Sequence, residues 1–137
     1  MSTTQSPAYL DSSFIVCYLI NDPPEMAEKA ASIIDSEQLL FVSALILAES
    51  AYVLDSVYQI PRADLVAALI SFLQRANIQL AHLPKPIALD ALRLCRNSKR
   101  ISFADALLWA EVFSSDNQQV YTFDARFPSD GIKTLNG

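Results

Sequence analysis

Short apolar segments alternate along the chain with longer apolar segments that are punctuated by polar residues. The short runs predict strands at residues 7–10, 39–42, 78–83, 120–123 and 132–135. The longer segments predict helices at about residues 11–20, 25–34, 44–58, 61–73, 86–95 and 103–114. Strands and helices therefore alternate along most of the chain.

Signals for helix starts agree with this division. Ser43 and Ser102 stand where an N-cap serine is expected, and Pro24 and Pro61 stand where a helix opens. Short apolar strands separated by helices are typical of a parallel sheet with helices on both faces. We therefore predict an α/β fold in three layers, α/β/α, around a central, mainly parallel sheet of four or five short strands. Its length of 137 residues suits one domain.

Two acidic side chains directly follow predicted strands. Asp11 comes after the first strand and is the only charged residue before Asp22, and Asp124 comes after the strand at 120–123. In parallel sheets, ligand sites lie beyond the carboxyl ends of the strands. The sequence places both acids at that edge, although Asp11 also suits a helix N-cap and Asp124 an Asx-turn paired with Arg126.

Two further acids stand inside predicted helices. Glu49 is the only charge between Glu37 and Asp55, and apolar residues surround it on almost every helical face. If buried it would be costly without a cation, whereas at the edge of the helix it would reach solvent. Asp105 stands three residues after Ser102, which suits a capping box as well as a ligand. Four carboxylates that face one another become stable together when they hold hard divalent cations, which prefer oxygen ligands.

Other chemistries lack the residues that they need. The only glycines are Gly131 and Gly137 at the end of the chain, which excludes a glycine-rich nucleotide-binding loop. His82 is the only histidine, which excludes a two-histidine acid–base nuclease within one chain. No G-x-S-x-G nucleophile motif occurs, and the first strand is not followed by paired acids of the phosphoaspartate or dehalogenase type.

The net charge of −5 gives no overall cationic field to attract a nucleic acid, so a polyanionic substrate has to be held locally. The segment LRLCRNSKR, just before Asp105, contains Arg96, Lys99 and Arg100 and is the strongest basic cluster. These residues and Arg126 are candidates for contact with phosphate. The alternatives are a solvated helix end, where cations are favoured, and a pairing of Arg126 with its neighbouring acid.

The sequence also indicates in which cellular compartment the protein is found. Cys17 and Cys95 are far apart and have no metal-ligand spacing, which favours a reduced, cytoplasmic protein. The apolar run at residues 14–20 is too short to span a bilayer, and no signal-peptide pattern surrounds it, so no membrane association is expected. Residues 1–6 are predicted to form a disordered tail.

The segments LDSSFIVCYL, SALILAESAYVL, ISFADALLWAEV and VYTFDARF resemble, in order and spacing, the four acidic motifs of PIN domains. The resemblance runs from about residue 8 to about residue 130, and it is strongest to the short bacterial VapC-type toxins of toxin–antitoxin pairs. It implies a Mg²⁺- or Mn²⁺-dependent ribonuclease. Carried onto this chain, it implies catalytic, metal-binding roles for Asp11, Glu49, Asp105 and Asp124, with hydroxyl groups nearby from Ser12, Ser43 and Thr122.

The chemistry implied by the resemblance is metal-assisted hydrolysis of RNA phosphodiester bonds. A bound cation lowers the pKa of its water from ~15.7 toward neutrality, and the acids orient metal and water. The products would carry 5′-phosphate and 3′-hydroxyl ends. Two alternatives stay open at this point: a PIN nuclease of RNA processing that is not a toxin, and a non-catalytic PIN-like interaction module.

The partners implied are an RNA substrate, a cognate antitoxin and a second copy of the chain. A homodimer could use the apolar stripe of the helix that follows Pro61, which consists of Leu65, Val66, Leu69, Ile70 and Leu73. The same stripe would serve equally well as ordinary core.

Overall fold

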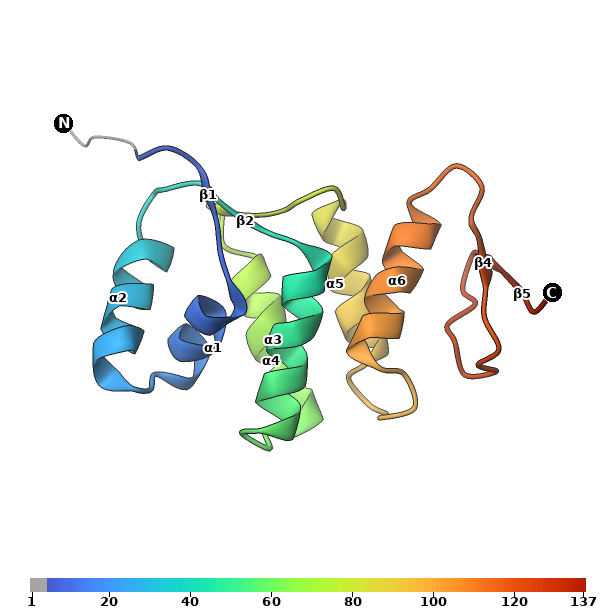
Figure 1. The fold of residues 1–137 in the computed structure, drawn as a ribbon, viewed down its shortest axis with the longest axis horizontal. Helices are drawn as coiled ribbons and strands as arrows, with labels where there is room; N and C mark the ends of the chain where they lie inside the picture. The colour runs from blue at the N-terminus through green and yellow to red at the C-terminus, as the bar shows by residue number, and fades with distance from the viewer. Residues whose placement is uncertain (1–4) are drawn as a thin grey trace.

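The structure is a computed structural model that describes residues 5–137 (Figure 1). Each predicted helix and strand is present, with bounds within a few residues of those expected. The elements are β1 (Ala8–Tyr9), α1 (Ser12–Ile20), α2 (Pro24–Ile34), β2 (Leu40–Val42), α3 (Ala44–Ser56), α4 (Arg62–Leu73), β3 (Ile78–Leu80), α5 (Lys85–Leu94), α6 (Phe103–Phe113), β4 (Gln119–Tyr121) and β5 (Lys133–Leu135).

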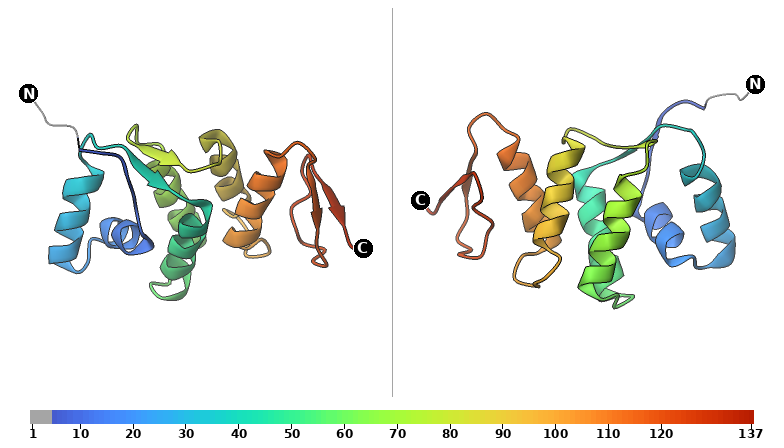
Figure 2. Two further views of the ribbon diagram at one scale, coloured as in Figure 1. Left: turned by 45° about the horizontal axis from the view of Figure 1, so that its top comes forward. Right: turned by 180° about the vertical axis from the view of Figure 1, so that it is seen from behind.

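The strands of residues 5–137 form two separate parallel sheets rather than the single sheet that we predicted. One sheet has the order β1-β2-β3, and the other pairs β4 with β5. Figure 1 shows β4 and β5 at the opposite end of the molecule from α2 and β1, and the view from behind in Figure 2 agrees. The α/β class and the parallel pairing are confirmed. The predicted strand count per sheet is wrong, because nothing in a strand's own sequence says which neighbour it will pair with.

The two faces of the three-stranded sheet have different surroundings. Leu40, Val42 and Ile78 are buried on the face that meets the helices, whereas Phe41 and Gln79 on the other face are only half-buried. Tyr9 lies beside Phe41 on that second face, with 5.5 Å between the ring centroids, and is 64% exposed. A complete helical layer on both faces, as the three-layer prediction required, is therefore not present over these strands.

The core is continuous and draws on every helix. The apolar stripe of α4 is buried within it, and its members are Leu65, Val66, Leu69, Ile70 and Leu73. A side chain already packed against the core of its own chain cannot form an interface with a second copy. The prediction that this stripe forms a dimer surface is therefore wrong, and its alternative as ordinary core is confirmed.

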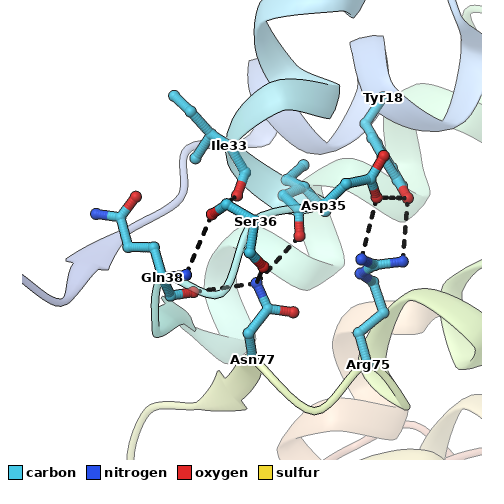
Figure 3. A network of polar contacts seen from close by, with 8 residues as sticks. Tyr18, Ile33, Asp35, Ser36, Gln38, Arg75 and Asn77 are labelled. Atoms are coloured by element: carbon cyan, nitrogen blue, oxygen red, sulfur yellow. Dashed lines mark hydrogen bonds and ion pairs between the residues drawn. The ribbon is translucent and has the colours of Figure 1, made fainter. Parts of the chain in front are cut away.

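A polar network ties the ends of three helices together beside β3 (Figure 3). Arg75, just after α4, lies 3.1 Å from the carboxylate of Asp35, and the Tyr18 hydroxyl of α1 donates to the same carboxylate at 2.7 Å. The Asn77 side-chain amide donates to the carbonyl oxygens of Ile34, Ser36 and Gln38 at 3.0 Å each. These bonds fix the connection between α2 and β2.

The pair β4–β5 is fixed to α6 rather than to the other sheet. The Trp109 indole N–H donates to the carbonyl of Asp130 at 2.8 Å, and Phe127 is buried in the core. Gly131 has a φ of +71°, and a Cβ at this position would lie 2.6 Å from the Phe113 ring. Glycine is therefore required where the chain passes α6 to enter β5.

Two predictions concern the chain's start and its relation to membranes. Of the predicted tail at 1–6, residues 1–4 lie outside the described residues, and the carbonyl of Ser6 accepts a hydrogen bond from the Gln38 side chain at 2.8 Å. Within residues 5–137, no helix has the length and apolar character needed to cross a membrane.

Candidate functional site

Asp11 stands at the carboxyl end of β1 and also caps α1. Its backbone is extended, with φ −88° and ψ 161°, and its Oδ2 accepts hydrogen bonds from the Ser13 hydroxyl at 2.9 Å and the Ser13 backbone N–H at 3.3 Å. These bonds, the hydroxyl bond first, lower the pKa of Asp11 below its usual value of 3.8. The prediction of a helix cap is confirmed, and the carboxylate is exposed and ionised at neutral pH.

Ser12 connects this turn to α3. Its hydroxyl donates to Oε1 of Glu49, a residue 37 positions further along the chain. Helix α1 packs against α3, which holds the two elements in this relation. The hydrogen bond therefore brings the Asp11–Ser12 turn and the Glu49 carboxylate to one place on the surface.

Glu49 is exposed, so the buried position that would have been costly without a cation does not occur. Two apolar residues on the same side of α3 are also exposed. Leu45, four residues before Glu49, is 75% exposed, and Tyr52, three residues after it, is 66% exposed. The apolar neighbours in the sequence suggested core, but part of that apolar surface faces solvent. The alternative, an edge position that reaches solvent, is confirmed.

Asp105 lies in the first turn of α6. Ser102 caps this helix, and its side chain accepts the Asp105 backbone N–H at 3.0 Å. The Asp105 carboxylate is half-buried, and it takes part in no ion pair or side-chain hydrogen bond within residues 5–137. Since α6 packs against α3, the helix that carries Asp105 borders the helix that carries Glu49. The N-cap role of Ser102 is confirmed, but the Asp105 carboxylate makes no return hydrogen bond to the Ser102 backbone, so the predicted capping box is only half formed and the carboxylate oxygens stay available.

Asp124 follows β4 and is bound within its own turn. Its Oδ1 accepts the Arg126 backbone N–H at 2.8 Å, with the Arg126 guanidinium 3.4 Å away, and its own N–H donates to the Thr122 hydroxyl at 3.1 Å. These interactions, the backbone bond first, lower the pKa of Asp124. The predicted Asx-turn and pairing with Arg126 are confirmed. A hollow of about 330 Å³ lies beside this turn and is lined in part by Phe123 and Asn136.

The four acids do not converge within one chain. Among residues 5–137, no three Asp, Glu, His or Cys side chains lie close enough together to share a metal ion. The donor chemistry suits Mg²⁺, since carboxylate and hydroxyl oxygens are what a hard cation prefers. Too few of these oxygen donors lie in one place, however, to hold a metal ion. The split sheet leaves the end of β4, and with it Asp124, away from the end of β1. The other three acids, Asp11, Glu49 and Asp105, do not form such a group either.

The remaining predicted neighbours have local structural partners. Ser43 caps α3 by accepting the Ile46 N–H at 3.2 Å, and Thr122 accepts the N–H of Asp124. The Ser43 hydroxyl is thus used as the predicted helix cap, and the Thr122 hydroxyl is used in the turn that contains Asp124.

Three of the four candidate basic residues lie on one exposed loop, and the fourth lies in the turn after β4. Arg96, Lys99 and Arg100 are exposed on the loop between α5 and α6, and none forms an ion pair within residues 5–137. Arg126 pairs with Asp124 at 3.4 Å. The three loop residues therefore remain available to a polyanion.

Arg62 is an important residue that sequence reasoning missed. Its guanidinium is largely buried and donates to the carbonyl oxygens of Ile101 at 2.9 Å and Ser98 at 3.2 Å, so it holds the basic loop and the start of α6. The signal was its place in the first turn of α4, where the helix dipole disfavours a cation. An arginine at such a position indicates another use for its charge.

A family model for the PIN domain matches residues 8–130, which covers all four acidic motifs and most of the chain. The chain belongs to the PIN domain family. PIN domains are generally metal-dependent nucleases, and the resemblance seen in the four motifs is thereby confirmed at the level of the family. No curated protein gives a match to the chain.

Proposed function

We propose that this PIN domain is an endoribonuclease that hydrolyses RNA phosphodiester bonds and depends on Mg²⁺ or Mn²⁺. The observation that carries the proposal is the hydrogen bond from Ser12 to Glu49. It joins the end of β1 to α3 and so places two of the four motif acids, Asp11 and Glu49, on one exposed surface. The family match over residues 8–130 supports nuclease chemistry at that surface.

The residues of this surface have separate tasks. Ser13 keeps Asp11 ionised by hydrogen bonding to its carboxylate, so Asp11 presents negative charge at every pH above its lowered pKa. Ser12 orients the Glu49 carboxylate by donating to one of its oxygens, which leaves the other oxygen for a ligand or for water. Within residues 5–137, no three potential ligands gather at this surface, so its two acids do not by themselves form a complete cation site.

An assay with purified protein and single-stranded RNA tests the proposal. Cleavage is expected with Mg²⁺ or Mn²⁺ and not with a chelator. Asp11→Asn and Glu49→Gln should each lower the rate by orders of magnitude while circular dichroism stays native. Glu28→Gln is the matched control, because Glu28 is exposed on α2 and away from the Ser12–Glu49 contact. Cleavage that persists in both site variants would refute the assignment.

We further propose that the chain is the toxin of a type II toxin–antitoxin pair, acting in the cytoplasm. The order of the acidic motifs supports the VapC-like type, and two free, buried cysteines suit a reducing compartment. Expression alone should arrest growth of a bacterial host and degrade RNA, whereas co-expression with the product of an adjacent small reading frame should restore growth. Normal growth and intact RNA without any partner would favour a non-toxin nuclease of RNA processing.

A second candidate function is a non-catalytic PIN-like interaction module. The observation in its favour is that no three potential metal ligands gather within residues 5–137. The two candidates differ in whether the native protein binds a metal ion. Metal binding can be measured by thermal stability, because a ligand that binds the native state raises stability by RT ln(1 + [L]/Kd). A melting temperature that Mn²⁺ leaves unchanged, together with no cleavage of RNA, would favour the module.

A further inference from the structure

The hollow of about 330 Å³ beside the Asp124 turn lies where β4 and β5 end. Its lining combines Phe123 and Asp124, which follow β4, with Asn136, which directly follows β5. Ligands of parallel sheets bind beyond the carboxyl ends of the strands. Pockets for small molecules have volumes of about 300–1,000 Å³, so this hollow suits one ring system rather than a helix of a partner protein.

The walls of the hollow are held by the fold itself. The Thr122 N–H donates to the Leu135 carbonyl at 2.8 Å, and this bond joins the ends of the two strands. The Phe127 N–H donates to the Asp124 carbonyl at 3.1 Å, and the Phe127 ring is buried in the core. A site whose walls are ordered before a ligand arrives loses little conformational freedom on binding.

Phe123 is the most distinctive residue of the lining. Its side chain is 95% exposed, the highest value among the exposed large apolar side chains of residues 5–137. A single exposed apolar residue needs no explanation by itself, but this one lines a hollow together with polar residues. A free aromatic ring offers a flat face on which an unpaired base of RNA can stack.

Three polar residues complete the lining. Ser129, Thr134 and Asn136 are exposed, and their side chains form no hydrogen bonds within residues 5–137. The hydroxyl groups can donate or accept, and the amide of Asn136 offers a donor beside an acceptor. A paired donor and acceptor match the edge of a nucleobase, and asparagine pairs with adenine in this way.

A positive charge lies next to the hollow. The Arg126 guanidinium is 3.4 Å from Oδ1 of Asp124, and the Arg126 side chain is 60% exposed. An exposed guanidinium can contact the phosphate of a nucleotide whose base is in the hollow. Ring, amide and guanidinium thus match the base face, the base edge and the phosphate of one nucleotide. An apolar side chain of a peptide would use the ring alone.

We propose that this hollow is a base-binding subsite for one unpaired nucleotide of single-stranded RNA, with the base stacked on Phe123 and its edge bonded to Asn136. The proposal rests on the proposed nuclease function and names a part of its substrate. Because the motif acid Asp124 lines the same hollow, the bound base belongs to a nucleotide beside the cleaved bond. Duplex RNA does not fit, since its bases are stacked on one another and paired.

Binding of RNA in a chelator tests the subsite without any cleavage. Fluorescence anisotropy of a labelled single-stranded oligoribonucleotide is the measurement. Phe123→Ala should weaken binding about 5-fold to 150-fold, the range expected for the loss of one stacked base. Phe123→Tyr keeps the ring and should bind as the wild type does. Tyr121→Ala is the matched control, because Tyr121 is 75% exposed and close in sequence but does not line the hollow.

The dependence on the base separates stacking from a general effect of charge. An abasic oligomer of equal length keeps all its phosphates, and with it Phe123→Ala should have no effect. Among oligomers of the four bases, oligo-A should bind the wild type most tightly, and Asn136→Ala should even out this preference. Phe123→Ala should weaken all four oligomers, since every base has a face that stacks. A loss that is equal with the abasic oligomer would overturn the stacking, and an unchanged preference in Asn136→Ala would overturn the role of its amide.

The outcomes separate the subsite from the nuclease. If the protein cleaves RNA and Phe123→Ala binds and cleaves as the wild type does, the subsite is wrong and the proposed function stands. If RNA binding depends on Phe123 but no cleavage occurs with Mg²⁺ or Mn²⁺, the subsite stands and the proposed function is refuted. If Phe123→Ala binds RNA normally but loses a co-expressed partner protein, the hollow belongs to that protein and the RNA subsite is overturned. Circular dichroism of each variant should stay native, because the substituted side chains are exposed.

Discussion

Arg62 offers the sharpest test of how this fold is held together. Its side chain is 11% exposed, and its Nη1 donates to the carbonyls of Ile101 at 2.9 Å and Ser98 at 3.2 Å. Its guanidinium carbon lies 4.5 Å from the centre of the Phe103 ring. One side chain at the start of α4 thus fixes the loop before α6 and the first residue of α6. Replacing Arg62 by Met keeps the length and the apolar stem but removes every polar contact.

The expected loss of stability follows from these contacts. Hydrogen bonds from a charged donor contribute about 1.5–3 kcal/mol each, and a cation–π contact contributes about 0.5–2 kcal/mol. The native state already bears the cost of burying the charge, and the Arg62 Nε has no hydrogen-bond partner, so part of the gain is cancelled. The Asp55 carboxylate, 3.8 Å away and partly exposed, adds little. We expect Arg62→Met to lower the free energy of unfolding by about 2–4 kcal/mol.

Urea denaturation followed by circular dichroism measures this change, with the slope of the transition checked for two-state behaviour. Arg93→Met is the matched control, because Arg93 pairs with Asp90 on an exposed helix face and should cost less than about 0.5 kcal/mol. Trypsin should also cut the loop between α5 and α6 faster in Arg62→Met, since the loop loses its attachment. Equal stability of the two variants and unchanged proteolysis would refute the reasoning.

Three further predictions concern charged and titrating groups. Asp105→Asn should lower apo stability by about 0.3–1 kcal/mol, because a charge is lost at a helix N-terminus; calorimetry in chelator that shows no change or a gain would contradict this. Burial raises the pKa of the Cys95 thiol from 9.0 to about 11, so the stability contributed by the neutral thiol is complete below pH 9 and is lost as the pH rises through about 11. Because both cysteines are buried, Cys17 and Cys95 should resist a thiol reagent until urea is added. The pKa of Asp11 is below 3.8, so its contribution is present above that pH and lost as the pH falls through the lowered value; NMR titration should show this, and Ser13→Ala should move the midpoint up toward 3.8.

Local features of this protein could be predicted from sequence because they depend on residues a few positions apart. Asp11, Ser43 and Ser102 cap the helices that their positions predicted, and Asp124 forms the predicted turn with Arg126. Each of these interactions joins groups within three residues. Its geometry is fixed by the local backbone, and no information about the rest of the chain is needed.

The position of Glu49 shows what the sequence pattern could not decide. Its apolar neighbours left a buried and a solvent-facing position both open, and in the structure Glu49 is exposed together with Leu45 and Tyr52. Which side of an apolar helix is covered depends on what packs against it. Only the positions of α1 and α6 around α3 decide that, and they also create the Ser12–Glu49 hydrogen bond between residues far apart in the chain.

The largest difference between the fold predicted from the sequence and the observed fold lies in the pairing of the strands. The sequence determined that five short strands would occur among the helices, that acids would follow two of these strands, and that the motifs are those of a PIN domain. Only the tertiary structure decided that β4 pairs with β5 and not with β1, which separates Asp124 from Asp11. A strand's side chains specify which of its faces is buried, but its backbone hydrogen bonds are the same for any neighbour. Pairing is therefore settled by how the connecting helices pack, here by the attachment of β4–β5 to α6 through Trp109.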